Sequence, residues 1–169
     1  MPVTGCRYFS GYKPCGRFSV CDTQCPHKDV PDQRILIVHL GALGAVVRST
    51  SLLQAIKRKY PSSHLTWVTD RPADQLLRGN PWVDRVLVTE TSDLLQLRAL
   101  HFDVGFCIDK SLKAAGVIAS THIRELFGFR ADAETSAIVP ANSAAEELWH
   151  LGLSNHNKFF EQIFISILF

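Results

Sequence analysis

The chain has 169 residues, of which 46% are hydrophobic and 20% are charged, so it can bury one core and carry a small appended module. Its formal net charge of +2 is far from the basic excess of most nucleic-acid binders. No apolar run has the length of a membrane span and the first five residues do not resemble a secretory signal, so a cytoplasmic protein is expected.

Four of the five cysteines lie within the first 25 residues. They are Cys6, Cys15, Cys21 and Cys25. Because cytosolic thiols stay reduced, a metal site is favoured over disulfides, and free surface cysteines are the remaining alternative. The spacing Cys-x8-Cys-x5-Cys-x3-Cys resembles that of the CCCH zinc fingers, with Cys25 in the place of their histidine. Four sulfur ligands suit tetrahedral zinc, and an iron–sulfur cluster is the alternative cofactor.

Aromatic residues between these cysteines allow a second interpretation. In CCCH fingers such rings stack on single-stranded RNA bases, and Tyr8, Phe9, Tyr12 and Phe18 are available here. A miniature metal module also needs aromatic rings simply to cover its ion, and the net charge is low. Nucleic acid is therefore the less favoured partner, and a metal-finger nucleic-acid binder stays as an alternative function.

A polar linker over residues 30–34 leads into a region in which strand and helix patterns alternate. Strands are predicted at 35–40, 65–69, 83–88, 103–108 and 124–127, and helices at 45–60, 73–78, 93–100, 112–120 and 144–151. This alternation predicts an α/β fold with a Rossmann-like parallel sheet that helices cover on both faces, since a parallel crossover needs a connection of helix length. Cys107, inside the fourth strand, is predicted to be a buried packing residue.

Three parts of the chain are distinguished. They are a four-cysteine metal-binding segment at 1–29, a Rossmann-like domain at 34–155 and an apolar tail at 156–169. The tail is too short to cross a bilayer. It is interpreted as a truncated end, as an interfacial or docking segment, or as a last element that folds back on the sheet.

Open parallel sheets bind ligands at the carboxyl ends of their strands, so the loop after the first strand is the first place to look for a site. Here that loop is Gly41-Ala42-Leu43-Gly44. Its glycines leave backbone amides near the start of a helix, which suits phosphate or another anion. The loop lacks the third glycine of the dinucleotide fingerprint, and a tight structural turn is the alternative.

Short motifs in the same order and spacing as in a known family run from Arg34 to about Arg130. They are the strand and glycine loop at 35–44, Tyr60-Pro61, Leu65-Thr66-Trp67-Val68, Asn80-Pro81-Trp82-Val83-Asp84-Arg85-Val86, the stretch 102–114 and Gly128-Phe129-Arg130. Together they resemble the amino-terminal half of the family-9 glycosyltransferases, best known as ADP-heptose:lipopolysaccharide heptosyltransferases. The resemblance implies a GT-B architecture, in which the amino-terminal domain holds the acceptor and a carboxyl-terminal domain grips the nucleotide-sugar donor.

The resemblance also implies the partners and the residues of the site. It implies a lipopolysaccharide-core-type glycan acceptor, proximity to the inner-membrane surface, and a nucleotide-sugar donor only where a second domain is present. Residues near the predicted crevice that would bind the acceptor or its phosphate groups are Gly41, Gly44, Arg48, Lys110, Lys113 and Arg130. Ordinary solvated charge is the alternative for the cationic ones.

The catalytic base that the resemblance implies is replaced in this chain. Inverting sugar transfer needs a base for the proton of the acceptor hydroxyl, and in this family a carboxylate at the glycine loop provides it. The Leu-Gly-Asp of the family is replaced here by Leu43-Gly44-Ala45, and a methyl group accepts no proton. Three substitute candidates remain, of which Asp109 is favoured: His39 ends the first strand, Asp70 follows the second and Asp109 follows the fourth. Their simpler roles are strand-end burial for His39, a turn cap for Asp70 and a helix cap for Asp109.

The expected function follows from the replaced carboxylate and from the length of the chain. We expect a glycosyltransferase-like protein whose donor domain is missing and which is inactive alone. A catalytically silent, metal-containing binding module is the alternative.

Overall fold

A six-stranded sheet with the order β3-β2-β1-β4-β5-β6 forms the centre of the molecule in the computed structural model, which describes residues 1–153. The strands are β1 (Arg34–Val38), β2 (His64–Thr69), β3 (Arg85–Val88), β4 (His101–Cys107), β5 (His122–Ala131) and β6 (Ile138–Pro140). Every pair from β3 to β5 is parallel, and β6 runs antiparallel to β5. The predicted mainly parallel α/β fold is confirmed, whereas the predicted tail at 156–169 lies outside the described residues.

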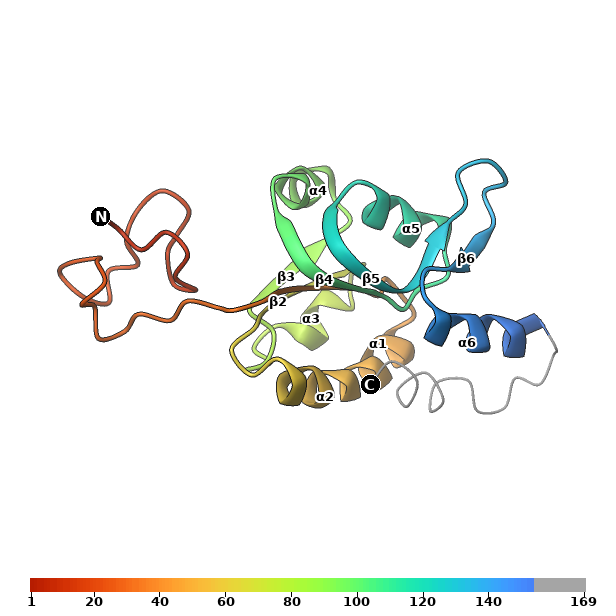
Figure 1. Cartoon of the computed structure of the whole chain (residues 1–169), viewed down its shortest axis with the longest axis horizontal. Helices are drawn as coiled ribbons and strands as arrows, with labels where there is room; N and C mark the ends of the chain where they lie inside the picture. The colour runs from red at the N-terminus through yellow and green to blue at the C-terminus, as the bar shows by residue number, and fades with distance from the viewer. Residues whose placement is uncertain (154–169) are drawn as a thin grey trace.

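Helices cover both faces of the sheet (Figure 1). One face carries α1 (Leu43–Ser49), α2 (Ser51–Lys59), α3 (Asp74–Leu77) and α6 (Ser143–Leu153), and the other carries α4 (Thr91–Arg98) and α5 (Leu112–Ala119). The central strand β1 shows why both faces need cover. Ile35 and Ile37 belong to the core cluster on the first face, and Leu36 and Val38 to the cluster on the second. A strand buried on both faces has the continuous apolar sequence seen here.

The helix predicted at 45–60 is divided into α1 and α2 at Thr50. Three consecutive hydroxyl side chains donate to carbonyl oxygens of the preceding turn. Ser49 donates to Ala45 O at 3.0 Å, Thr50 to Val47 O at 2.7 Å and Ser51 to Arg48 O at 2.8 Å. Such bonds compete with the backbone ladder and bend helices, which explains the division.

The end of the sheet differs most from the prediction. β5 has ten residues instead of the four predicted at 124–127, and β6 was not predicted at all. Beyond its pairing with β4, β5 continues and pairs Phe129 with Pro140 of β6. The helix α6 then packs on this hairpin, where the Trp149 indole donates to Ile138 O at 3.1 Å. β6 has only three residues and β5 is mostly exposed or half-buried, so neither has the apolar run by which strands are recognised.

The first 33 residues form a separate looped segment without a helix or strand, which stands to one side of the sheet (Figure 1). Within these residues no side chain is buried. Among the described helices of the chain, none combines the length and the apolar character needed to cross a membrane.

Candidate functional site at the carboxyl edge of the sheet

The strand order reverses direction at β1. From β1 the chain crosses to β2 and β3 on one side and later returns to β4 and β5 on the other, so the loops after β1 and β4 lie next to each other. Ile108, just after β4, still donates its backbone N–H to Val38 O at 3.1 Å. Doubly wound sheets bind ligands at such a switch point, which is where the Gly41–Gly44 loop stands.

The glycine loop is open to approach. A Cβ added to Gly41 would meet no atom within 4 Å, and one added to Gly44 would lie 3.9 Å from Nη1 of Arg48. Neither glycine has a positive φ, so the backbone conformation does not itself require them. The residue that precedes α1, Ala42, supplies no side-chain cap to the helix. The loop thus combines accessible backbone with Arg48, an exposed residue, and anion binding there stays a prediction.

The carboxylate of Asp109 links the two loops. One of its oxygens accepts the backbone N–H of Leu40 at 3.0 Å, and the other accepts that of Ser111 at 2.8 Å. Ser111, rather than Asp109, caps α5, because its hydroxyl oxygen accepts from Ala114 N. Asp109 therefore has a positioning role in the described structure, and its role as a base stays a prediction.

His39 lies behind the glycine loop and is only 8% exposed. Its Nδ1 is 2.7 Å from Oγ of Ser49, and that hydroxyl donates to Ala45 O. Because a hydroxyl has one proton to give, Nδ1 is the donor toward Ser49. This bond joins the strand end to α1 next to Ala45, so strand-end burial describes His39 well, and its predicted catalytic role is untested.

Asp70, which follows β2, is paired with Lys113 of α5. The Lys113 ammonium donates to both carboxylate oxygens, at 2.7 and 2.8 Å, and the hydroxyl of Thr89 donates to one of them. Partial burial by itself raises the pKa of Asp70, but the hydrogen bonds from Lys113 and Thr89 and the lysine charge lower it below its ordinary value. A phosphate group would therefore have to displace the Asp70 carboxylate before it could bind Lys113.

The other two predicted cations lie toward β5. Lys110 has its Nζ 5.1 Å from the centroid of the Phe129 ring, and burial lowers the pKa of Lys110. Arg130 is exposed on β5, opposite Val139 of β6. Of the predicted acceptor-binding residues, Gly41, Gly44 and Arg48 form one group at the loop.

Two residues near this edge were not singled out from the sequence for the site. Ser49 holds His39, and Thr89 holds Asp70 across 19 residues of sequence. Neither residue belongs to a local sequence motif, because the partner that each one binds lies on another part of the fold.

Cys107 is a packing residue, as predicted. It is 1% exposed, and its thiol lies 3.4 Å from Asp109 O. Burial, together with the charge of Asp109, raises the pKa of the Cys107 thiol to about 12. A thiol held protonated in this way is not a nucleophile at neutral pH.

The four amino-terminal cysteines are free thiols. Among the described residues, no three side chains of His, Cys, Asp or Glu stand close enough to hold a metal ion. The predicted metal site is therefore not confirmed by this arrangement, and zinc or an iron–sulfur cluster stays a prediction.

Comparison with curated proteins supports the resemblance to the heptosyltransferases. No protein-family model matches the chain. Over 105 residues the chain is 25% identical to lipopolysaccharide heptosyltransferase 1 of Campylobacter coli, a match that covers 57% of this chain and 30% of that protein. The chain thus spans about a third of the length of this curated relative.

Solved structures show the same fold in part of larger molecules. The heptosyltransferase WaaC of E. coli with ADP has a TM-score of 0.50 at 18% identity, over 56% of this chain and 36% of that one. A family-9 glycosyltransferase of Veillonella parvula has a TM-score of 0.53 at 16% identity, over 83% of this chain and 41% of that one. The ADP-heptose lipopolysaccharide heptosyltransferase II of E. coli has a TM-score of 0.50 at 22% identity, over 56% of this chain and 30% of that one. The mixed α/β fold of this chain is therefore similar to part of the GT-B heptosyltransferase structures.

Proposed function

We propose that the sheet domain is the acceptor-side domain of a heptosyltransferase-like glycosyltransferase. It would hold a phosphorylated glycan of the lipopolysaccharide-core type at the carboxyl edge of the sheet. The observation that carries the proposal is the open glycine loop at the switch point of a fold that is similar to part of the heptosyltransferases. Proximity to the inner-membrane surface follows from such an acceptor, and it belongs to the proposal.

The chemistry available at the loop suits binding better than proton transfer. Arg48 offers a charged fork of donors beside accessible backbone, an arrangement that favours phosphate oxygens. Deprotonation of an acceptor hydroxyl needs a base within hydrogen-bond reach, and Ala45 has none to offer. The carboxylate oxygens of Asp109 already accept two backbone N–H groups. We therefore propose that these 169 residues bind an acceptor and that transfer requires a donor-side domain.

Binding is tested with a phosphorylated lipopolysaccharide-core oligosaccharide added to the isotope-labelled protein. We expect NMR shifts in the amides of 39–45 and 109–113, and a Kd that rises by at least about tenfold in Arg48→Ala, since a charge-assisted hydrogen bond contributes roughly 1.5–3 kcal/mol. Arg58→Ala, at the exposed far end of α2, is the matched control and should leave the Kd unchanged. Equal binding of the dephosphorylated oligosaccharide would contradict the phosphate contact.

Transfer is tested separately by incubating the 169 residues with ADP-heptose and the same oligosaccharide. We expect no product. Detectable turnover would overturn the proposal that the domain is inactive alone, whatever the outcome of the binding experiment.

The alternative, a catalytically silent binding module, is favoured by Ala45 and by the backbone bonds of Asp109. It is distinguished by fusing the chain to the donor-side domain of an active relative, with and without Ala45→Asp. Transfer only with Ala45→Asp supports a silent module, and transfer without that change supports an active acceptor-side domain.

A further inference from the structure

The four amino-terminal cysteines line one small hollow, although they are spread over 20 residues of sequence. Cys6, Cys15, Cys21 and Cys25 all border it, together with His27. Phe9 and Phe18 also line the hollow, so apolar residues lie beside the thiols, although Phe18 is 46% exposed. The fold of the segment thus turns every cysteine outside the sheet domain toward a common space.

No apolar core explains why this segment adopts a defined shape. Residues 1–33 contain no helix, strand or buried side chain, and Cys15, one of the four thiols, is exposed. Ordering so many residues costs roughly 1–2 kcal/mol each in backbone entropy alone. Segments of this size without a core are usually held by disulfides or by a metal ion, and all of these cysteines are free.

Local contacts prepare Cys6 and its surroundings for a thiolate. The backbone N–H of Asp29 points at Sγ of Cys6 at 3.5 Å, and N–H donors of this kind stabilise sulfur ligands. Residues 1–33 contain four cationic side chains and three acidic ones. The cations are Arg7, Lys13, Arg17 and Lys28, and the acids are Asp22, Asp29 and Asp32. This excess of one positive charge offsets part of the net charge of −2 that a zinc ion with four thiolates carries.

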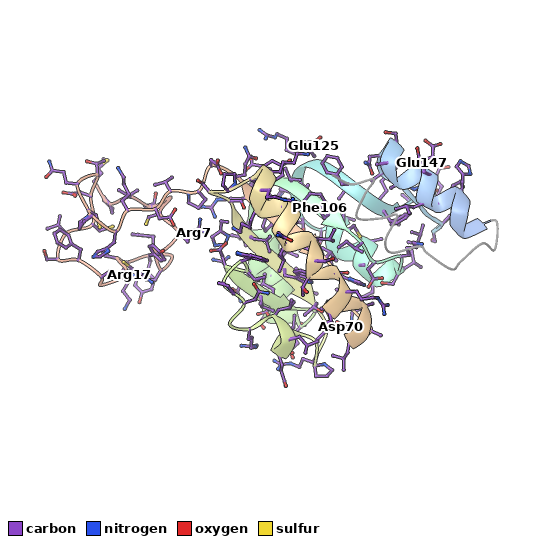
Figure 2. All side chains as sticks on the ribbon, turned by 90° about the horizontal axis from the view of Figure 1, so that it is seen from below. Arg7, Arg17, Asp70, Phe106, Glu125 and Glu147 are labelled. Carbon is purple, nitrogen blue, oxygen red and sulfur yellow. The ribbon has the colours of Figure 1, made fainter. Side chains whose placement is uncertain are left out.

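The side chain of Arg7 attaches this segment to the sheet domain. Arg7, next to Cys6, donates from Nε to Asp29 at 2.8 Å and from Nη1 to Asp84 and to Ser63 O. The second oxygen of Asp84 accepts the N–H of Leu65 in β2 at 2.7 Å. Figure 2 shows Arg7 between the segment and the sheet domain and Arg17 well inside the segment. The position of Cys6 is thereby connected to the amino edge of the sheet.

We propose that the cysteine-lined hollow binds one zinc ion through Cys6, Cys15, Cys21 and Cys25, and that binding stabilises the sheet domain through Arg7. As the side chains lie, no three of them converge on one point within the described residues, so the ion would draw the sulfurs inward from the walls of the hollow. Each thiol that becomes a ligand releases its proton to solvent, and no electron is transferred.

Metal content is measured on the full chain purified under reducing conditions. We expect one zinc per chain, replaceable by cobalt with the visible absorption of a tetrahedral thiolate site. Cys15→Ser should raise the zinc Kd at least about 100-fold in a chelator competition, because even the loss of an outer-shell partner costs 10–100-fold. Cys107→Ala, buried in the sheet domain, is the control and should bind zinc as the wild type does. A zinc-free chain with four reactive thiols overturns the proposal, and so does iron bound with inorganic sulfide.

The link through Arg7 is tested by thermal unfolding with and without a zinc chelator. Chelation should lower the Tm of the wild type, and Arg7→Met should remove most of this difference while it still binds zinc. Arg17→Met, which removes the guanidinium 3.7 Å from the centroid of the Tyr8 ring inside the segment, should keep the difference. An equal Tm drop in wild type and Arg7→Met would overturn the link.

Discussion

Four aspartate carboxylates bind main-chain N–H groups at or near the ends of strands in this protein. The carboxylates of Asp84, Asp93, Asp103 and Asp109 each accept a backbone N–H at or near a strand end, over 2.7 to 3.0 Å. An ionised carboxylate is a strong acceptor for such orphan donors. Asp109 follows the same pattern as three aspartates far from the glycine loop, which is why its position after a strand does not by itself indicate catalysis.

A buried histidine makes the stability of the domain depend on pH. His64, the first residue of β2, is 7% exposed. Burial, assisted by the charges of Arg85, Arg34 and Arg7 against that of Asp84, lowers its pKa from 6.5 to about 4. The unfolded chain therefore binds more protons between these values, and the stability present above pH 6.5 is lost as the pH falls toward 4.

We expect the free energy of unfolding to fall by a few kcal/mol over this window, since one pKa unit corresponds to about 1.4 kcal/mol. Urea unfolding at a series of pH values measures the slope. His64→Gln, which does not titrate, should flatten the curve of stability against pH between 4 and 6.5. Parallel curves for the two proteins would show that another group causes the loss.

At the scale of elements, β5 depends on one glycine. Gly128 pairs with Cys107 as the last β4 partner, and the next residue already pairs with β6. Its φ is +98°, and a Cβ there would lie 2.0 Å from Cys107 O. The change of partner strand thus takes place where a side chain has no room, so glycine is required by both conformation and space.

Gly128→Ala should destabilise the domain by at least about 2 kcal/mol, because a strained left-handed residue costs roughly 1–3 kcal/mol and the backbone contact adds to it. Gly116→Ala is the matched control. Gly116 lies inside α5 with open space around it, and alanine there should stabilise by about 0.5–1 kcal/mol. Chemical unfolding measures both, and equal effects would contradict the special position of Gly128.

At the scale of the whole molecule, two core clusters share one sheet. Leu53 of α2 is fully buried on one face and Leu97 of α4 on the other. Because the strands between them contribute alternate side chains to both clusters, neither face is expected to unfold alone.

Leu53→Ala and Leu97→Ala should therefore each lower the stability by about 2–5 kcal/mol within a single transition. Circular dichroism and tryptophan fluorescence, the latter including buried Trp67, should report the same midpoint in each variant. A second transition in only one of them would show that the two faces are independent.

The sequence by itself determined the alternating strands and helices, the parallel sheet and the place of the glycine loop, because each depends on local apolar periodicity and on the rule that parallel crossovers need helices. It also predicted that Cys107 is buried. The tertiary structure decided the rest, because the deciding contacts join residues far apart in the chain. Lys113 meets Asp70 across 43 residues and Asp109 meets Leu40 across 69. The pairing of β6, the pKa of His64 and the hollow shared by the cysteines likewise exist only once the chain is folded.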